Sequence, residues 1–453
     1  MKTAAFLLAI WVGFHSFSAP ISYIMRVSVE ESGAFQGEVT LNIAGLLGVG
    51  ELLFRLYPNH FGHLLRVEEA RSEGKSLPLD AVEPTVLVVQ LPSELPQTAS
   101  LHLRFSGVLP RELLGYGIFA HTARAMIMSQ FYPILAPWEG EWLLHPTFPF
   151  GDNLVAEAAD YLVFLQVPSG WVPVASGEER KTGWNTWQIN GENLREFCLV
   201  LVREYTGLVD RWADVEIRVF FPFGFDQAGK RALAIAKEAL PLLTARLGSF
   251  PFPDVDLIAA PLSGAGGVEY PRLILINQDY ALDPYTDFFA EIVVHELAHQ
   301  WWYGEVGTDQ VAEPWLDEAL ATYTSSLYFE VQGELEQKVR EWQDRFLQAK
   351  KLNPQASVGS GLWEFLGRSG YAGYVYAGGA LLLHEVRSSL GDEIFFSILR
   401  NFREKYRWRI ARACDFLGLL AEELGPLFSA LALEYFGDQP QCQTEPTGSV
   451  NPR

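Results

Sequence analysis

The chain has 453 residues, of which 55 are acidic and 34 are Lys or Arg, so its formal net charge is −21. Hydrophobic residues make up 49% of it and aromatic residues 13%, which is typical of a foldable globular chain and excludes a disordered one. Nucleic acid and anionic membrane surfaces are disfavoured as partners, because binding to them depends on clustered Lys and Arg. The length allows about two to four domains.

The first residues have the composition of a targeting segment. Lys2 precedes an apolar run from Ala4 to Phe14, and small residues follow at Ser16 and Ser18. We therefore expect a secretory signal peptide over residues 1–18 and an exported protein, either periplasmic or extracellular; a short buried N-terminal segment is the alternative. No other stretch approaches the roughly 20 apolar residues of a spanning helix, so no stable membrane span is expected after cleavage.

The cysteines and the first large segment carry no sign of a metal site. Cys198, Cys414 and Cys442 form no C-x-x-C pair, so neither a thiolate zinc site nor a disulfide scaffold is predicted. Between residues 19 and 207, short apolar runs alternate with Gly, Pro, Ser and Asn. This spacing predicts a β-rich domain of paired sheets. Examples of the runs are Thr85–Gln90, Ala99–Phe105, Tyr161–Val167 and Phe197–Leu201.

The pattern changes after Gly207, where we place a domain boundary. Strands are predicted at Val215–Phe221, Val255–Ala259 and Leu273–Asn277, with a helix over Asp226–Leu247 and a glycine-rich turn at Gly264–Gly267. Helical spacing dominates thereafter, so residues 208–440 are predicted to form a mainly helical α+β domain, followed by a polar tail over 441–453. The helical runs are Phe289–Tyr303, Trp315–Val331, Glu334–Lys350, Tyr374–Leu390 and Glu393–Tyr406.

The first of these helices contains the segment His295-Glu296-Leu297-Ala298-His299. Residues four apart lie on one face of a helix, so both imidazoles can reach one zinc ion at about 2.0–2.1 Å. Glu296 lies one step round the helix, where its carboxylate can act on a water molecule without taking a coordination position. The spacing therefore predicts a metal site in which Glu296 is the general base.

A catalytic zinc needs a third protein ligand, which has to come from a neighbouring element. The chain turns after Gly304 and Gly307, and Pro314 suits the start of a second helix that carries Glu318 in its first turn. Glu318 is the predicted third ligand, with Asp317 or Glu313 as the alternatives. Two imidazoles and a carboxylate favour one Zn2+ per chain, although Co2+ or Mn2+ could substitute.

These residues resemble the gluzincin metallopeptidases of family M1, which include aminopeptidase N and leukotriene hydrolase. The similarity lies in the run from His295 to Gly304 and in the acidic ligand of Trp315-Leu316-Asp317-Glu318-Ala319. It implies an N-terminal β domain with a saddle-like sheet and a thermolysin-like catalytic domain, which together give a multidomain α and β protein. It also implies a short form without the large C-terminal helical domain of longer members.

The resemblance also implies roles for residues outside the zinc motif. Gly266-Gly267-Val268-Glu269-Tyr270 is similar to the family's G-x-M-E-N segment, so Glu269 is expected to bind the substrate's α-amine and Gly266 and Gly267 to line the substrate site. Tyr376 lies in a segment similar to Y-x-K-G-A and is expected to stabilise the oxyanion, with Tyr371 and Tyr374 as alternatives. Gln130, in a T-Q-F-like segment, is expected to line the site. His384 lies in an apolar run and is interpreted as a core residue.

The function predicted from these residues is a secreted zinc aminopeptidase that hydrolyses the first peptide bond of peptides with a free N-terminus, using a metal-activated water. Three alternatives stay open at this point. The first is a zinc endopeptidase on the same scaffold, the second an epoxide hydrolase, and the third a catalytically inert binding module. The sequence fixes neither the residue preference at the first subsite nor the oligomeric state.

Overall fold

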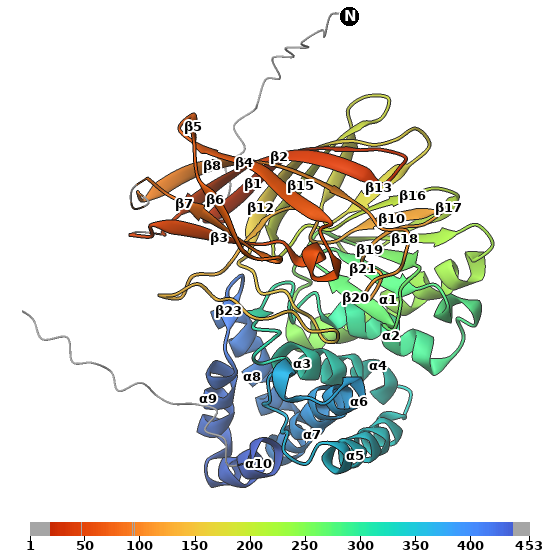
Figure 1. The fold of residues 1–453 in the computed structure, drawn as a ribbon. Coiled ribbons are helices and arrows are strands. Elements are labelled where there is room, and N and C mark those ends of the chain that lie inside the picture. The colour runs from red at the N-terminus through yellow and green to blue at the C-terminus, as the bar shows by residue number, and fades with distance from the viewer. Residues whose placement is uncertain (1–18, 47, 93, 95, 438–453) are drawn as a thin grey trace, which may run out of the picture.

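The computed structural model describes residues 19–46, 48–92, 94 and 96–437; the predicted signal peptide and the predicted polar tail lie outside the described residues. The strands of the N-terminal part gather at the top of Figure 1, and helices α3 to α10 gather at the bottom. The expected order, a β-rich domain followed by a mainly helical domain, is confirmed.

An eight-stranded sheet is the largest element of the N-terminal part. Its β2 strand alternates strictly, with Phe35, Val39, Leu41 and Ile43 buried on one face, and this period of two is what a sheet with one face in the core requires. In spatial order the strands are β14 (Glu178–Lys181), β15 (Thr186–Leu194), β12 (Ala159–Gln166), β1 (Ile21–Val29), β2 (Ala34–Ala44), β8 (Thr98–Val108), β4 (Leu65–Ser72) and β5 (Lys75–Ser76).

Two four-stranded sheets complete this part. β16 is buried along its whole length, which fits its continuous Leu-Val-Leu-Val sequence. The first sheet has the order β13 (Val172–Ala175), β16 (Leu199–Val202), β10 (Ala125–Met128) and β9 (Phe119–His121). The second has the order β11 (Ile134–Leu135), β3 (Glu51–Arg55), β7 (Val86–Gln90) and β6 (Leu79–Glu83), and a 3-10 turn spans Tyr57–Phe61.

A five-stranded mixed sheet begins the second part. Its order is β17 (Tyr205–Trp212), β18 (Val215–Pro222), β19 (Asp254–Ala260), β21 (Leu273–Asn277) and β20 (Gly267–Tyr270). β18 and β19 are parallel and are joined by helix α1 (Asp226–Leu247), whose bounds agree with the sequence prediction. The boundary placed after residue 207 falls inside β17. β20 is the edge strand of this sheet, and it lies against helix α2 (Asp287–Ala298).

The remaining helices surround α3 and α7. They are α3 (Trp315–Ser325), α4 (Leu327–Glu330), α5 (Leu335–Leu352), α6 (Arg368–Ala372), α7 (Gly379–Leu390), α8 (Asp392–Tyr406), α9 (Ala413–Leu424) and α10 (Pro426–Phe436). Two 3-10 turns span Tyr280–Leu282 and Leu362–Glu364, and β22 (Gly307–Thr308) pairs with β23 (Ile410–Ala411). No helix among the described residues is both long and apolar enough to cross a membrane.

Three predicted helices differ from the structure in ways that matter for the site. The one expected over Phe289–Tyr303 ends at Ala298, and the chain turns through Tyr303, whose φ is 105°. The one expected over Trp315–Val331 breaks at Ser326, whose hydroxyl donates to the Tyr323 carbonyl at 2.6 Å instead of leaving it to the helix ladder. The one expected from Tyr374 opens with a π-helical segment, Gly373–Gly378, before α7.

A buried arginine joins the two parts. The Arg195 guanidinium, 2% exposed, donates to the carbonyl of Ala156 at 3.2 Å and to those of Glu305 and Arg409 at 3.4 and 3.2 Å. Because a buried guanidinium is costly unless its N–H groups are paired, these bonds fix the β-rich part against the loops that follow α2 and α8.

The two cysteines among the described residues differ in state. Cys198 is free and fully buried in the β-rich part. Cys414 is disulfide-bonded. The cysteine spacing argued only against a disulfide scaffold and left a single bridge possible, so a bridge at Cys414 is compatible with it.

Candidate metal centre and substrate cleft

Helix α2 positions the two histidines. Thr286 caps its start, where the Thr286 hydroxyl accepts from the Phe289 N–H at 3.2 Å. Buried apolar side chains hold the helix between β20 and α3, and His299 at its C-cap keeps a helical φ of −62°. The spacing of four residues therefore survives to the last turn, and the His295 and His299 rings lie 4.7 Å apart between centroids.

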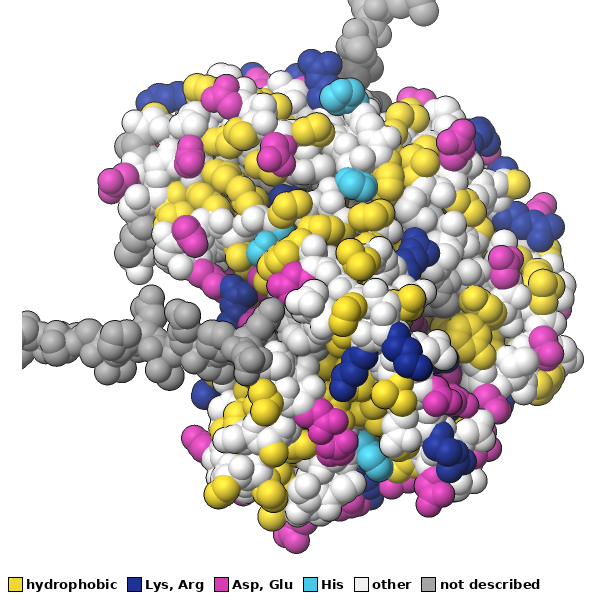
Figure 2. All heavy atoms as spheres, turned by 60° about the horizontal axis from the view of Figure 1, so that its bottom comes forward, with side chains coloured by type: hydrophobic (Ala, Val, Ile, Leu, Met, Phe, Trp, Pro, Cys, Tyr) yellow, Lys and Arg dark blue, Asp and Glu magenta, His cyan; other side chains and the backbone are white. Residues whose placement is uncertain are grey.

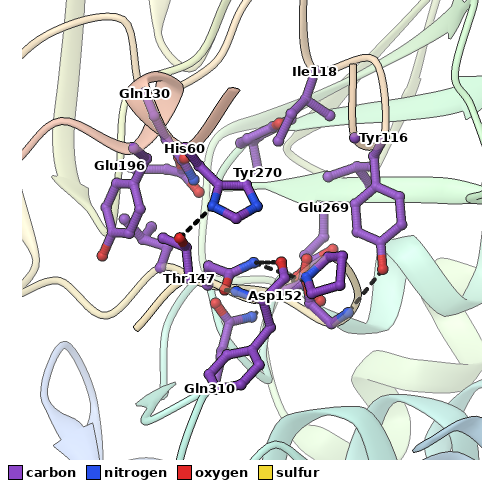
Figure 3. Close-up of a pocket in the computed structure, with 18 of the residues that line it drawn as sticks. His60, Tyr116, Ile118, Gln130, Thr147, Asp152, Glu196, Glu269, Tyr270 and Gln310 are labelled. Atoms are coloured by element: carbon purple, nitrogen blue, oxygen red, sulfur yellow. Dashed lines mark hydrogen bonds between the residues drawn. The ribbon is translucent and has the colours of Figure 1, made fainter. Parts of the chain in front are cut away.

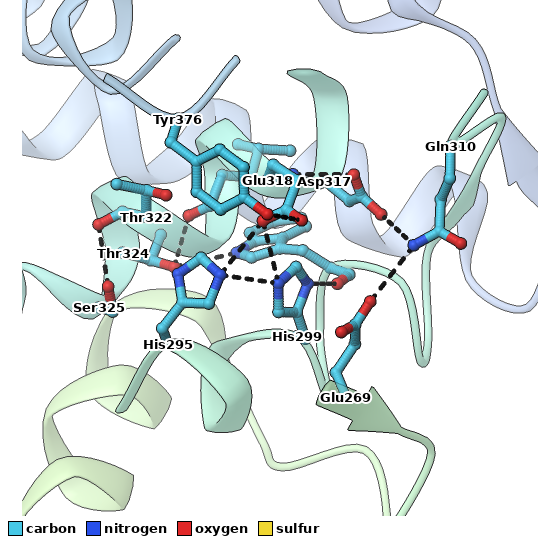
Figure 4. Close-up of polar contacts among 12 residues, drawn as sticks. Glu269, His295, His299, Gln310, Asp317, Glu318, Thr322, Thr324, Ser325 and Tyr376 are labelled. Atoms are coloured by element: carbon cyan, nitrogen blue, oxygen red, sulfur yellow. Dashed lines mark hydrogen bonds and ion pairs between the residues drawn. The ribbon is translucent and has the colours of Figure 1, made fainter. Parts of the chain in front are cut away.

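The three predicted ligands converge on one point (Figure 4). His295 Nε2 lies 3.1 Å from Glu318 Oε2 and 3.0 Å from His299 Nε2, while His299 Nε2 lies 3.4 Å from Glu318 Oε2. Ligand atoms bound to one tetrahedral ion at about 2.0–2.1 Å lie ~3.3 Å from one another. The observed separations are close to that value, so the three side chains fit a zinc ion without rearrangement of the helices.

The surroundings of the ligands also suit a metal. His299 Nδ1 lies 2.9 Å from the carbonyl of Trp302, an arrangement in which a neutral His299 donates its N–H there and keeps the Nε2 lone pair for a metal. Burial would raise the pKa of Glu318, but hydrogen bonds and charge from His295 and His299 hold it below its usual value. A deprotonated carboxylate and a neutral imidazole nitrogen are what metal binding needs.

The two alternative ligands have other partners. Asp317 Oδ1 accepts from the Glu318 N–H at 2.8 Å, and its Oδ2 accepts from the Gln310 amide at 3.0 Å. Glu313 Oε2 accepts from the Ala413 N–H at 3.0 Å. Of the three acidic residues weighed from the sequence, only Glu318 belongs to the cluster with both histidines.

Glu296 is buried beside the cluster with one oxygen unused. It is 6% exposed, and its Oε2 has no hydrogen-bond partner within the described part of the chain. Burial, followed by the charge of Glu269, raises its pKa well above the ordinary value. A Cβ on Gly267 would lie 2.5 Å from Glu296 Cγ and Oε1, so only glycine lets strand β20 run this close to the carboxylate.

Glu269 lies on strand β20 and not in the turn before it. Its side chain is buried, and its Oε1 accepts from Gln310 Nε2 at 3.3 Å, as Figure 4 shows. Burial raises the pKa of Glu269, while the charge of His299 opposes that shift. The neighbouring Gly266 faces Ile292, which a Cβ would meet at 3.0 Å. Glu269 thus stands in the wall next to the ligands without belonging to the same triad.

Tyr376 reaches the cluster from the π-helical segment. Its hydroxyl donates to Glu318 Oε1, and its ring stacks on His295 at 5.7 Å. Tyr374, the first alternative, instead donates to the carbonyl of Asn353 at 2.8 Å. Tyr371, the second, packs edge-on against Tyr376 at 5.6 Å and lines the same cavity. Extra residues in a helical turn often occur at functional sites, and here the turn points one tyrosine at the ligands.

A cavity of about 340 Å3 lies over the ligands. Its wall contains both histidines, Glu318, Glu296, Glu269 and Tyr376. It also contains residues that sequence reasoning missed, namely Tyr116, Asp152, Phe288, Arg345 and Arg368.

Two other residues singled out in the sequence lie elsewhere. Gln130 lines an adjoining smaller cavity and has a φ of 54°. His384 is away from the cluster and packs on Tyr323, and burial lowers its pKa.

Figure 2 shows one face of the molecule's surface. On the face shown in Figure 2, basic side chains lie scattered among acidic and hydrophobic ones.

Two imidazoles and a carboxylate around one point, with a second carboxylate on the ligand helix, define the class of H-E-x-x-H metal sites. Residues 231–436, which carry all three converging side chains, match the Peptidase family M1 domain, the family that the sequence resembles.

Curated relatives and a solved structure are also similar to the chain. Aminopeptidase M1 of Arabidopsis thaliana is 27% identical over 265 residues, which cover 54% of this chain and 29% of the relative. Aminopeptidase M1-B of Oryza sativa subsp. japonica is 26% identical over 442 residues, covering 90% and 48%. The chain thus spans less than half the length of these curated relatives. An M1 zinc metallopeptidase from Deinococcus radiodurans has the same fold, with a TM-score of 0.72 at 19% identity over 95% of this chain and 96% of that one.

Proposed function

We propose that the protein is a zinc-dependent aminopeptidase that removes the first residue of peptides with a free N-terminus, with one Zn2+ per chain. The observation that carries the proposal is the position of Glu269, a buried carboxylate in the wall of the same cavity as the His295, His299 and Glu318 cluster. A buried carboxylate at that place can pair with an α-ammonium, which would otherwise be left as an expensive unpaired charge.

Each residue of the site has a separate role in the proposed hydrolysis. His295, His299 and Glu318 would hold the zinc, which when bound lowers the pKa of a water molecule toward 7 and polarises a carbonyl. Glu296 accepts the proton of the attacking water and passes it to the departing amine. Glu269 holds the α-ammonium, so that only the first peptide bond lies over the ligands.

Tyr376 is proposed to donate a hydrogen bond to the oxyanion that forms during attack. Replacing Tyr376 by Phe removes that donor, and kcat is expected to fall by about 10²–10³ because one fixed oxyanion donor contributes that much. KM and zinc content should change little. Tyr374→Phe is the matched control, since the Tyr374 hydroxyl is bound to the Asn353 carbonyl. Equal loss of kcat in both variants would contradict the role of Tyr376.

The test of the whole proposal is a panel of aminoacyl-arylamides with and without an N-acetyl group, assayed on the zinc-loaded protein. Free substrates should be hydrolysed, and acetylation should lower kcat/KM by at least about 100-fold, because the buried Glu269 then has no cation to pair with. Glu269→Gln should reduce the activity on free substrates and narrow the difference between the two series. Chelation of the metal should abolish both activities.

Each alternative has its own outcome in this panel. Equal hydrolysis of acetylated and free peptides would favour an endopeptidase and remove the role of Glu269. A protein that binds zinc but hydrolyses no amide would favour another reaction class, such as epoxide hydrolysis. A purified protein that binds no metal would favour an inert binding module.

A further inference from the structure

A second, smaller cavity adjoins the one over the metal ligands. Its volume is about 90 Å3, several times the roughly 10–15 Å3 that one water molecule needs on the same measure. The two cavities share Tyr116, Asp152, Val268 and Glu269 in their walls. Since Glu269 is the proposed partner of the α-ammonium, the smaller cavity begins where the first residue of a bound peptide would lie.

The smaller cavity is acidic. Asp152, Glu196 and Glu269 line it, and none of the described lining residues is Lys or Arg (Figure 3). His60 is its one imidazole, and His60 Nδ1 is occupied by the Thr147 hydroxyl at 2.6 Å. Burial, followed by the charge of Glu269, raises the pKa of Asp152 well above its ordinary value. The cavity therefore gathers three carboxyl groups with no Lys or Arg in its described lining, and a cation that enters it would favour their charged forms.

Glu196 supplies the observation that points to a ligand. It is 3% exposed, its Oε1 accepts from the Tyr303 hydroxyl, and its Oε2 has no hydrogen-bond partner among the described residues. Burial raises the pKa of Glu196 to about 8, although Tyr303 and the nearby Gln130 amide oppose that shift. The hydrolytic roles given above make no use of this carboxylate. A buried carboxylate oxygen without a donor is costly, and a cation that enters the cavity would remove that cost.

On the basis of the proposed aminopeptidase function, we propose that this cavity receives the side chain of the substrate's first residue, and that Glu196 and Asp152 select lysine or arginine there. The long apolar stem of a basic side chain can pass Val268, Tyr116 and Ile118, which line the cavity between its polar groups. The ammonium or guanidinium then reaches the two carboxylates. Gln130 and Gln310 also line the cavity and can orient the group.

Substrates whose first residue is apolar or acidic fit the smaller cavity less well. An apolar side chain of equal length would leave the carboxylates buried and unpaired, and a site built for polar pairing discriminates against such an analogue strongly. An acidic side chain would add a like charge to the three carboxylates already present. The expected order of preference is therefore basic, then apolar, then acidic.

The first experiment uses the zinc-loaded wild-type protein and substrates matched in length. The kcat/KM for lysyl-arylamide should exceed that for norleucyl-arylamide at least tenfold, and arginyl should exceed citrullinyl similarly, because only the charged member of each pair meets the carboxylates. Glutamyl-arylamide should be the poorest. Equal rates within both matched pairs, with norleucyl still hydrolysed, would overturn the subsite and leave the aminopeptidase function standing.

Variants assign the preference to residues. Glu196→Gln and Asp152→Asn should each lower the lysyl-to-norleucyl ratio at least fivefold, whereas Glu192→Gln, at an exposed position on β15, should keep it. A ratio unchanged in both cavity variants would overturn the assignment.

Should a cavity variant fail to fold, binding of free lysine and norleucine to the Glu296→Gln protein provides the second measurement. Lysine that binds no more tightly than norleucine would overturn the subsite, whereas tighter lysine binding supports it. A zinc-loaded wild type that hydrolyses no arylamide would overturn the aminopeptidase function and this inference together.

Discussion

Replacing Glu296 by Gln is expected to lower kcat by at least about 100-fold while zinc stays bound at its wild-type level. A positioned general base contributes about 10²–10⁴-fold, and Glu296 is the carboxylate on the ligand helix that coordinates nothing in the predicted arrangement. Its Oε2 is buried without a hydrogen-bond partner in the described structure, so the base has a lone pair directed at no protein group. Steady-state kinetics and metal analysis of the same preparation measure the two quantities.

Two features make this substitution informative. Gln has nearly the same shape as Glu and can occupy the same space against Gly267, where the backbone leaves no room for a different side-chain position. The packing of β20 on α2 is therefore preserved. Asp287→Asn is the matched control, because Asp287 lies in the exposed first turn of the same helix. Wild-type turnover in Glu296→Gln would show that another group takes the proton, and loss of zinc would show that Glu296 contributes to the metal site instead.

The clustering of the three candidate ligands was predictable because it follows from local geometry. His295 and His299 needed only the 3.6-residue period of a helix, and α1 and β21 were placed with the right bounds by the same kind of local pattern. Predicting Glu318 also required the prediction of a second helix that packs on the first. Pro314 and the apolar run after it indicated that helix.

Residues around the ligands were harder to predict, because long-range packing brings them there. Glu269 follows the predicted turn at Gly264–Gly267 and no strand was predicted for it, yet it lies on an edge strand whose existence depends on pairing with β21. Tyr376 was assigned through the resemblance. No pattern in its own segment predicted the π-helical turn that directs its side chain toward the candidate ligands. Asp152 and Glu196 come from the β-rich part, where no local pattern distinguishes a cavity carboxylate from a surface one.

The two cavities draw their side chains largely from different parts of the chain. The chemical step depends on α2 and α3, whereas the smaller cavity is built largely by residues of the β-rich part, which Arg195 ties to the loops behind the metal site. Substitutions in the β-rich part should therefore change which first residue is accepted more than they change the reaction itself. Residue preference can vary between chains that share the same ligands.

Replacing Glu318 by Ala is expected to weaken zinc binding by at least about 100-fold and to abolish detectable peptidase activity. Loss of a polar partner of a ligand already costs 10–100-fold in metal affinity, so loss of a ligand should cost more. The two histidines would remain, but a two-ligand site has neither the negative charge nor the third coordinating atom that Zn2+ requires. Competition with a chromophoric chelator measures the affinity directly.

The controls for Glu318→Ala come from the residues that the sequence left as alternatives. Glu313→Gln and Asp317→Asn should bind zinc as the wild type does, because Glu313 binds the Ala413 N–H and Asp317 binds Gln310 and the Glu318 N–H. If either control lost zinc while Glu318→Ala kept it, the ligand assignment would be wrong. Loss confined to Glu318→Ala would leave its carboxylate as the third ligand, since the three side chains lie within one short stretch of chain and differ only in where they point.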